Sequence, residues 1–324
     1  MRELELLSYI ERVAASQPRD FPRVVVPPGD DCAAVRTPSG DLLLAKVDQV
    51  VGGRHFTPPV TWDRDEPGPD GLTRDAYLGL IARKSVARAL SDIGAMAGRP
   101  MFGLAAACLP AGFPSDAAEA LAEALHRWGS AWSCPIVGGD IASAGRADPG
   151  PLVIGLTVIG LAHASRGPVL RSEARPGDEV YVTGSLGGSL EASGLGRHLT
   201  FEPRVPEGAA LADALGARLH AMMDISDGLG LDAGRMGRAS GLVVELDGVR
   251  VPVTPGSDLR GALRDGEDYE LLFAVEAGAA PPELACGVTK IGVCRVPDGS
   301  TPGARVRHAD GTTTEVSRLG WEHT

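Results

Sequence analysis

The sequence predicts an α/β protein of two domains with mixed sheets, close to the α+β kind, and three observations support this fold class. At 324 residues the chain is long enough for two hydrophobic cores. Helix-like and strand-like patterns occur together in both halves, without the regular alternation of a doubly wound fold. A stretch rich in glycine and proline begins at residue 163. We therefore expect domains over residues 1–162 and 163–324.

The first half opens with apolar residues near helical spacing, which predict a helix over residues 2–15. Runs of aliphatic residues predict strands, and Ser115 is expected to cap a helix rich in alanine. Residues 57–73 are rich in proline, aspartate and glycine and are expected to form a loop. The strands are expected at 23–26, 41–51, 101–109, 134–139 and 151–162, and the further helices at 74–96 and 116–130.

The second half repeats the mixture of elements. The sequence predicts one helix after Gly187 and another from Ala209, which follows a loop at 202–207. No short internal repeat is evident. The strands of this half are expected at 179–184, 242–246 and 269–275.

The chain carries a net charge of −11 and contains only three lysines, Lys46, Lys84 and Lys290. An acidic protein without basic clusters is a poor candidate for nucleic-acid binding, which requires side chains that neutralise phosphates. If such a protein handles phosphates, it needs bridging cations, and Mg²⁺ is the usual one. We therefore expect no nucleic-acid partner, while Mg²⁺-dependent phosphate chemistry stays open.

Neither a membrane nor an oxidising compartment is expected. The longest nearly continuous apolar run, residues 151–162, is too short to cross a bilayer. The first residues are charged and amphipathic, unlike a signal peptide. The five cysteines form no C-x-x-C pair, which argues against a disulfide framework and a thiolate zinc site. We expect a cytoplasmic protein.

Five turns share one design, in which an apolar segment ends in small residues and aspartate. Mg²⁺ prefers hard oxygen ligands and usually shares them with substrate phosphates. Glycines beside an aspartate let a phosphate approach the backbone N–H groups. Any one such turn is more often a surface turn or a helix cap, but five together favour a site for metal and nucleotide. The aspartates are Asp30 and Asp31, Asp48, Asp92, Asp140, and Asp224 with Asp227.

The familiar nucleotide motifs are absent from the sequence. Lys84–Ser85 lacks the glycine lead of a P-loop and lies within a helical pattern. Residues 182–189, "VTGSLGGS", do not match the G-x-G-x-x-G of a dinucleotide fold. The sequence also lacks the catalytic and metal-binding loops of protein kinases. Any ATP chemistry must use another architecture.

Several short motifs occur along the chain. They are "GDDCAAV", "VDQVVGGRHF", "ALSDIGAMAGRP", "VGGDIAS", "LRSEARPGDEVYVTGSLGGS", "MMDISDGLGLD" and "GEDYELLF". Together they resemble the thiamine-monophosphate kinase family, which belongs to a superfamily with aminoimidazole ribonucleotide synthetase and selenophosphate synthetase. The matches follow the order of the family and extend from Glu3 to Trp321, and "DISDGL" and "GEDYEL" are the most specific of them.

The resemblance implies Mg²⁺-assisted in-line transfer of the γ-phosphoryl group of ATP to thiamine monophosphate, giving thiamine diphosphate. It implies an N-terminal domain that binds ATP and Mg²⁺ and pairs in a homodimer, and a C-terminal domain that completes the site. Catalysis would come from positioning and from the metals, with no catalytic side chain assigned. The implied metal ligands are Asp30, Asp48, Asp92, Asp140, Asp224 and Asp227; Gly139, Arg171 and Ser226 would bind ATP; and His55, Glu267 and Trp321 would bind thiamine monophosphate.

Some positions depart from the family pattern. Lys46 and Val47 stand where two small hydroxyl residues are usual before Asp48. Lys46 either replaces part of the neutralising role of one metal or turns away from the cluster, and the role of Asp31 stays open. Two alternatives therefore remain: an ATP-dependent relative that acts on another small substrate, and a dimer that binds ATP or thiamine phosphates without turnover.

Overall fold

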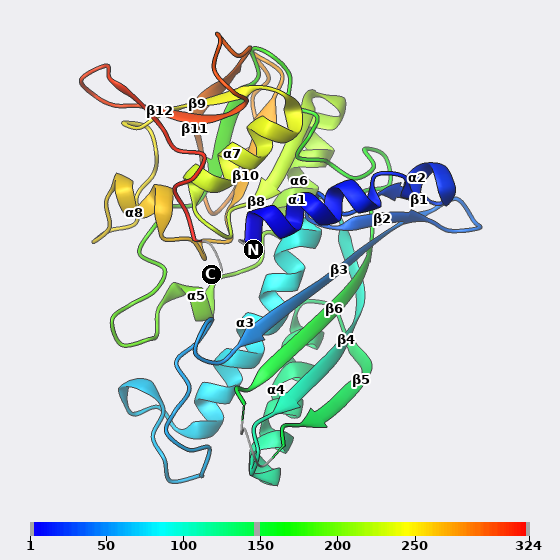
Figure 1. Ribbon diagram of the computed structural model, residues 1–324, viewed down its shortest axis with the longest axis vertical. Helices are drawn as coiled ribbons and strands as arrows, with labels where there is room; N and C mark the ends of the chain where they lie inside the picture. The colour runs from blue at the N-terminus through cyan, green and yellow to red at the C-terminus, as the bar shows by residue number, and fades with distance from the viewer. Residues whose placement is uncertain (1–2, 146–149, 322–324) are drawn as a thin grey trace.

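The computed structural model describes residues 3–145 and 150–321, and Figure 1 shows them as two sheets with helices packed against them. Among these described residues, the first sheet has six strands in the order β1-β2-β3-β6-β4-β5, of which β4 and β5 are the parallel pair. In the same part of the chain, the second sheet has seven strands in the order β13-β12-β9-β11-β7-β10-β8, of which β12 and β9 are the parallel pair. Both sheets are mixed, which confirms the predicted fold class.

The first sheet and its helices come from the chain before residue 162. Alternate residues of the central strand β6 are buried, because one face of the sheet packs against helices and the other does not. Figure 1 shows α3 and α4 together beside this sheet. The elements are α1 (Glu3–Ala14), α2 (Gln17–Asp20), β1 (Val24–Val26), β2 (Ala33–Arg36), β3 (Leu42–Val51), the 3₁₀ turn Pro69–Gly71, α3 (Arg74–Ala95), β4 (Arg99–Leu109), α4 (Ser115–Ala131), β5 (Ile136–Ser143) and β6 (Val153–Leu161).

The second sheet is built from the rest of the described chain. Strands β8 and β10 are buried along their whole length, which is expected of strands covered on both faces. The elements are β7 (Glu179–Thr183), α5 (Arg197–Thr200), α6 (Val205–Leu215), the 3₁₀ turn Gly216–Arg218, β8 (Leu219–Asp224), α7 (Leu229–Ser240), β9 (Val243–Asp247), α8 (Leu259–Arg264), β10 (Leu271–Val275), β11 (Val288–Arg295), β12 (Gly303–Arg307) and β13 (Thr313–Glu315).

Helix α3 connects the two halves. It packs against β3, β4 and β6 of the first sheet and also against α5, α6 and β8. Thr73 caps its first turn by accepting the N–H of Ala76. Most of its residues are buried on every side, including the charged Lys84 and Asp92. A charge on a helix that is buried on every side is costly unless it is paired. Both halves of the molecule must therefore supply side chains of opposite charge to α3.

The structure corrects several predicted elements. No helix follows Gly187 directly, because the glycines there have positive φ and the N–H of Gly187 donates to Asp268. Residues 202–204 of the predicted loop at 202–207 lie outside any helix or strand, whereas residues 205–207 form the first turn of α6. Strand β2 was not predicted. Ser115 is the first residue of α4 rather than its cap, which is Pro114. The predicted boundary after residue 162 stays a prediction.

Within the described ranges, none of the helices is both long and apolar enough to span a membrane.

Gly139 has a steric role in β5. A Cβ atom at this residue would lie 1.6 Å from the carbonyl oxygen of Ala105 on β4, whereas one at Gly138 would meet only the side chain of Leu104 at 3.5 Å. We predict that Gly139→Ala lowers the free energy of unfolding by about 1–3 kcal/mol, the usual cost of overpacking. Gly138→Ala is the matched control, and denaturant titration measures both variants. Equal losses in the two variants would contradict the close contact.

Candidate active site

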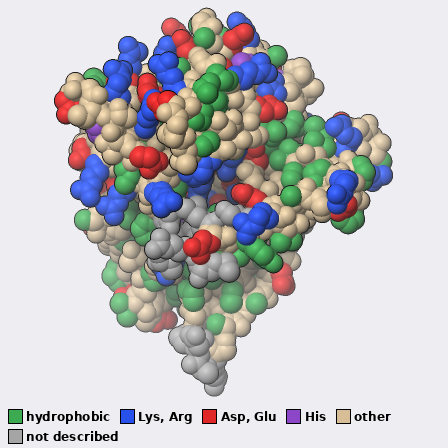
Figure 2. Space-filling view, turned by 45° about the horizontal axis from the view of Figure 1, so that its top comes forward, with side chains coloured by type: hydrophobic (Ala, Val, Ile, Leu, Met, Phe, Trp, Pro, Cys, Tyr) green, Lys and Arg blue, Asp and Glu red, His purple; other side chains and the backbone are tan. Residues whose placement is uncertain are grey.

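A large cavity lies between the two halves. Its volume is about 820 Å³, and its walls come from both sheets and from α1, α3 and α7. Figure 2 shows basic and acidic side chains intermixed on the face that it displays. The polar lining residues are Glu11, Asp30, Asp31, Lys46, Asp48, Arg88, Asp92, Arg171, Asp224, Ser226, Asp227, Arg235, Arg238, Tyr269, Ser317 and Arg318.

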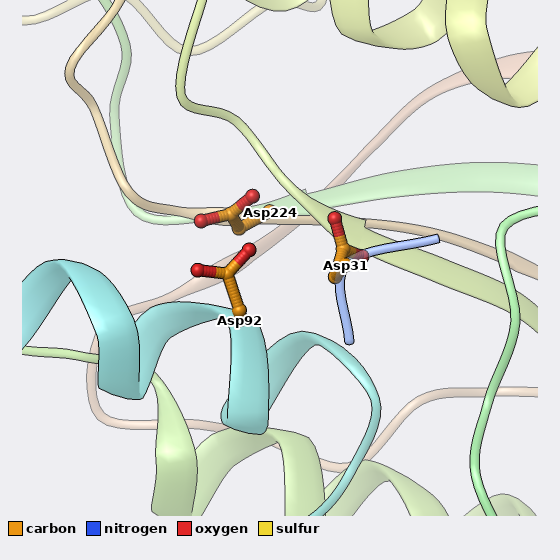
Figure 3. A group of neighbouring side chains, drawn as sticks. All are labelled: Asp31, Asp92 and Asp224. Atoms are coloured by element: carbon orange, nitrogen blue, oxygen red, sulfur yellow. The ribbon is translucent and has the colours of Figure 1, made fainter. Parts of the chain in front are cut away.

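Three buried carboxylates meet in this cavity. Figure 3 shows Asp31, Asp92 and Asp224 with their carboxyl groups facing one space, and one oxygen of each lies within 4.8 Å of the others. Asp92 is on α3, Asp224 ends β8, and Asp31 follows the turn after β1. Asp224 accepts the hydroxyl of Ser91 at 2.6 Å. Within the described chain, Oδ2 of Asp31 is buried and has no hydrogen-bond partner.

Burial raises the pKa of each of these carboxyl groups. The pKa of Asp31 rises to about 6 although Arg171 opposes the shift, and the pKa of Asp224 also rises to about 6. Burial also raises the pKa of Asp92 well above its usual value, against the attraction of Lys46. Carboxylates that are costly to ionise together form a site that favours a cation.

The neighbouring carboxylates are paired with cations of the chain itself. Lys46 Nζ donates to Asp92 Oδ1 at 2.8 Å, so Lys46 turns toward the cluster. Arg171 donates its backbone N–H to Asp30 at 3.1 Å and its guanidinium to Asp31.

Further along the same cavity, Arg88 forms a fork with Asp48, and Arg235 contacts Asp227 at 2.5 Å. The site therefore alternates negative and positive groups, which is the arrangement that a polyanion with cations requires.

A smaller cavity of about 300 Å³ adjoins the large one. Its walls include His55, Phe56, Glu267 and Trp321, and it is lined mainly by the loop after β3 and the segment before β10. Nδ1 of His55 accepts the N–H of Val51 at 2.9 Å, so the proton of the neutral ring is on Nε2. Residues Arg88, Ser226, Asp227 and Tyr269 line both cavities.

The "DISDGL" and "GEDYEL" motifs form one structural unit. The N–H of Glu267 donates to Ser226 O at 2.7 Å, and the N–H of Tyr269 donates to Ile225 O at 2.8 Å. Glu267 and Tyr269 have φ of 57° and 51°, which is uncommon for residues other than glycine. Strained backbone held by such bonds is common at functional sites. Residues of the two motifs therefore form most of the wall that the two cavities share.

Lys84 lies behind the smaller cavity and has no exposed side-chain surface. Its ammonium group contacts the carbonyl of His55 at 2.6 Å, Nδ1 of His198 at 2.8 Å and Oε2 of Glu267 at 2.5 Å. Burial lowers the pKa of Lys84 to about 8. Burial would raise the pKa of Glu267, but the hydrogen bond of His198 and the charges of Lys84 and Arg88 lower it to about 2. Glu267 is therefore an anion in this wall.

The structure brings most of the predicted site residues together. The larger cavity gathers Asp30, Asp31, Asp48, Asp92, Asp224, Asp227, Lys46, Arg171 and Ser226. The smaller one gathers His55, Glu267 and Trp321. Gly139 and Asp140 line neither cavity; they lie on the edge strand β5, where Asp140 is exposed. Their predicted roles stay predictions.

Sequence reasoning missed Lys84, Arg88 and Arg235. Lys84, Arg88 and Asp92 follow one another at intervals of four residues along α3, which places them on one face of the helix. This regular spacing of charges in a helix that is mostly buried could have identified both cations. Arg235 follows Asp232 by three residues on α7, which is a local signal for that ion pair, but its contact with Asp227 depends on how α7 begins.

The chain is similar to known proteins in both sequence and fold. Residues 29–162 match the model of the AIR synthase related protein, N-terminal domain, which defines the class of fold. Thiamine-monophosphate kinase of Rhodopirellula baltica is 33% identical over 300 residues, covering 87% of this chain and 84% of that protein. The enzyme of the same name from Salmonella typhimurium is 32% identical over 292 residues, covering 82% and 79%. The chain therefore belongs to the thiamine-monophosphate kinase family of enzymes.

A solved structure supports the assignment. AaThiL complexed with AMPPCP and TMP is 25% identical, with a TM-score of 0.76, and the match covers 100% of this chain and 97% of that one. The similarity therefore extends over both halves and includes the segments that form the two cavities.

The Lys84–Glu267 pair is expected to contribute strongly to stability. We predict that Lys84→Met lowers the free energy of unfolding by about 3–5 kcal/mol, because it removes the buried ammonium group that offsets the charge of Glu267. Lys290→Met is the matched control, since Lys290 pairs with Glu179 at 2.5 Å but is 40% exposed. The control should lose less than about 1 kcal/mol. Urea titration measures both, and a small loss in Lys84→Met would contradict the importance of the pair.

Proposed function

We propose that the protein transfers the γ-phosphoryl group of ATP to the phosphate of thiamine monophosphate, forming ADP and thiamine diphosphate. The observation that supports this most is the pair of adjoining cavities with a shared wall of Arg88, Ser226, Asp227 and Tyr269. Phosphoryl transfer between two small molecules requires two such sites, open to each other where the phosphates meet. AaThiL, of the same fold, was solved with an ATP analogue and TMP together.

The larger cavity suits ATP. Its positive side chains, among them Arg171, Arg235 and Arg318, can bind phosphate oxygens, and Arg171 is held in place by Asp30 and Asp31. Leu7 and Ile10 of α1 add apolar surface to the same cavity, which suits a base. On this proposal, Ser226 contacts ATP at the wall that the cavities share.

The carboxylate cluster suits Mg²⁺. Asp31, Asp92 and Asp224 offer hard oxygen ligands close together. Oδ2 of Asp31, which is buried and has no hydrogen-bond partner among the described residues, can bind a cation. Asp31 therefore joins the proposed ligands, while both oxygens of Asp30 accept backbone N–H groups. Bound Mg²⁺ would offset the charge of the ATP phosphates. The side chains then have the tasks of holding the ions and orienting the two substrates.

The smaller cavity suits thiamine monophosphate. Trp321 and Phe56 supply aromatic surface for its rings, and the carboxylate of Glu267 can attract the cationic thiazolium. Lys84 and His198 both contact Oε2 of Glu267. The other oxygen, Oε1, lies 4.0 Å from Arg88, beyond hydrogen-bond distance. A phosphate monoester has a second pKa of about 6, so the acceptor phosphate is mostly a dianion at neutral pH. No side chain is then needed to remove a proton from it.

A homodimer is part of the proposal. The face of the first sheet that α3 does not cover exposes Val47 and Leu104, which lie in one row across β3, β6 and β4. Val137 and Ile141 are exposed on the edge strand β5. Exposed apolar surface at a sheet edge favours pairing with another chain. Sedimentation equilibrium tests this, and the mass of a single chain would contradict it. The cytoplasmic location also stays a prediction.

The decisive experiment incubates the protein with ATP, Mg²⁺ and thiamine monophosphate and separates the products by chromatography. We predict equal amounts of ADP and thiamine diphosphate. Asp224→Asn and Asp227→Asn should abolish turnover and leave the fold intact, because each removes charge from the site that neutralises the phosphates. Asp213→Asn, at an exposed position of α6, is the control.

Each other outcome has a distinct meaning. ADP without thiamine diphosphate would keep the ATP site and point to another acceptor. ATP binding without either product would favour the non-catalytic alternative. Near-normal turnover in both aspartate variants would contradict their proposed roles as metal ligands.

Lys46 is expected to limit metal binding, because its ammonium group already neutralises Asp92 at 2.8 Å. Burial would lower the pKa of Lys46, but the attraction of Asp92 and Asp48 raises it, so the charge persists. We predict that Lys46→Thr binds Mn²⁺ more tightly in the presence of AMPPCP and needs less Mg²⁺ for half-maximal rate. Electron paramagnetic resonance counts free Mn²⁺, with Lys290→Thr as control. Unchanged Mn²⁺ affinity would show that Lys46 does not compete with metal.

A further inference from the structure

Arg88 lies where the two cavities meet. Its side chain lines both of them, beside Ser226, Asp227 and Tyr269. On the proposed function, on which this inference rests, the phosphoryl group passes this wall on its way from ATP to the acceptor. We propose that Arg88 is a catalytic residue whose guanidinium hydrogen-bonds the phosphoryl group during transfer.

Asp48 holds the guanidinium in place. Arg88 donates Nε to Oδ2 of Asp48 at 3.1 Å and Nη2 to Oδ1 at 3.3 Å. Such a fork uses one edge of the group and fixes its plane. Tyr269 lies beside the group, with its ring centre 6.0 Å from the central carbon of the guanidinium. Arg88 is therefore positioned before a substrate binds, which lowers the cost of ordering it during the reaction.

One donor atom of Arg88 remains available. Among the described residues, Nη1 is buried and has no hydrogen-bond acceptor. Glu267 Oε1 lies 4.0 Å from it, within ion-pair range but beyond a hydrogen bond. Buried donors almost always have a partner, so an oxygen supplied by a ligand is the acceptor that this atom lacks.

The charges at the shared wall indicate which ligand supplies that oxygen. Of the four residues that line both cavities, Arg88 is the cation, and Asp227 is already paired with Arg235. Burial would lower the pKa of Arg88, but the attraction of Asp48 and the nearby carboxylates raises it, so the guanidinium stays charged. Two phosphates that approach each other repel, and a fixed cation between them offsets that repulsion.

The step itself balances without a proton transfer when the acceptor is a dianion. An acceptor oxygen forms a bond to the γ-phosphorus of ATP, while the bond from that phosphorus to the β,γ-bridging oxygen breaks. The electron pair of the broken bond stays on ADP, and the total charge of reactants and products is equal. Arg88 forms its hydrogen bond to an oxygen of the transferred group, where charge accumulates between the two partners.

A purely structural role is the competing explanation, in which Arg88 only neutralises Asp48. The two roles differ in which nitrogen atoms of Arg88 they require. The ion pair with Asp48 involves Nε and Nη2, and it does not explain a buried Nη1. They also differ in kinetics. Loss of a bond made only during transfer lowers kcat, whereas loss of structure weakens nucleotide binding and stability as well.

The test measures steady-state kinetics of Arg88→Ala and Arg88→Lys with ATP and thiamine monophosphate, and the affinity of each variant for AMPPCP. We expect kcat of Arg88→Ala to fall by about 10³-fold, as for other arginines that contact a transferred phosphoryl group. KM and AMPPCP affinity should stay within about threefold of wild type. Millimolar guanidinium should restore part of kcat in Arg88→Ala, and ammonium should not.

Arg83→Lys is the matched control, because Arg83 is a buried arginine of the same helix that donates to the carbonyl of Phe201, outside both cavities. We expect Arg88→Lys to lose kcat while Arg83→Lys retains it. A wild-type kcat in Arg88→Ala, or a loss of activity explained by weaker AMPPCP binding, would overturn the proposed role of Arg88 but leave the proposed function of the protein standing. A wild-type protein that forms no thiamine diphosphate would overturn the proposed function and this role together.

Discussion

The burial of charge along α3 is the constraint on which the rest of the structure depends. Lys84, Arg88 and Asp92 lie four residues apart on a helix that is packed by both halves. A charge buried without a partner is too costly to keep, so each must be met by an opposite charge. The partners are Glu267, Asp48 and Lys46, which come from distant parts of the chain. Folding of both halves around α3 therefore assembles the site.

The same row of charges orders the site in space. Eight residues of helix separate Lys84 from Asp92, a rise of about 12 Å. Lys84 supports the smaller cavity, Arg88 lies on the wall that both cavities share, and Asp92 belongs to the carboxylate cluster. On the proposed function, this one helix would set the spacing between the donor and the acceptor of the phosphoryl group.

Much of the site could be predicted because its aspartates end apolar segments, a pattern that local sequence displays. Asp48, Asp92 and Asp224 all lie in the larger cavity as expected. The failures occur where tertiary contacts decide the outcome. The segment after Gly187 is not a helix, since its backbone is bound to Asp268, more than eighty residues away. By contrast, the roles predicted for Gly139 and Asp140 stay predictions, since both residues lie on an edge strand outside both cavities.

The sequence by itself determined the mixed α/β class, the family and the set of acidic turns, because these follow from periodicity and from motifs that are contiguous in the chain. Only the tertiary structure decided which oxygens meet, that Lys46 faces the cluster, and that Arg88 stands between two cavities. The physical reason is that burial and pairing depend on distance in space. Asp31, Asp92 and Asp224 come within 4.8 Å of one another although long segments of chain separate them.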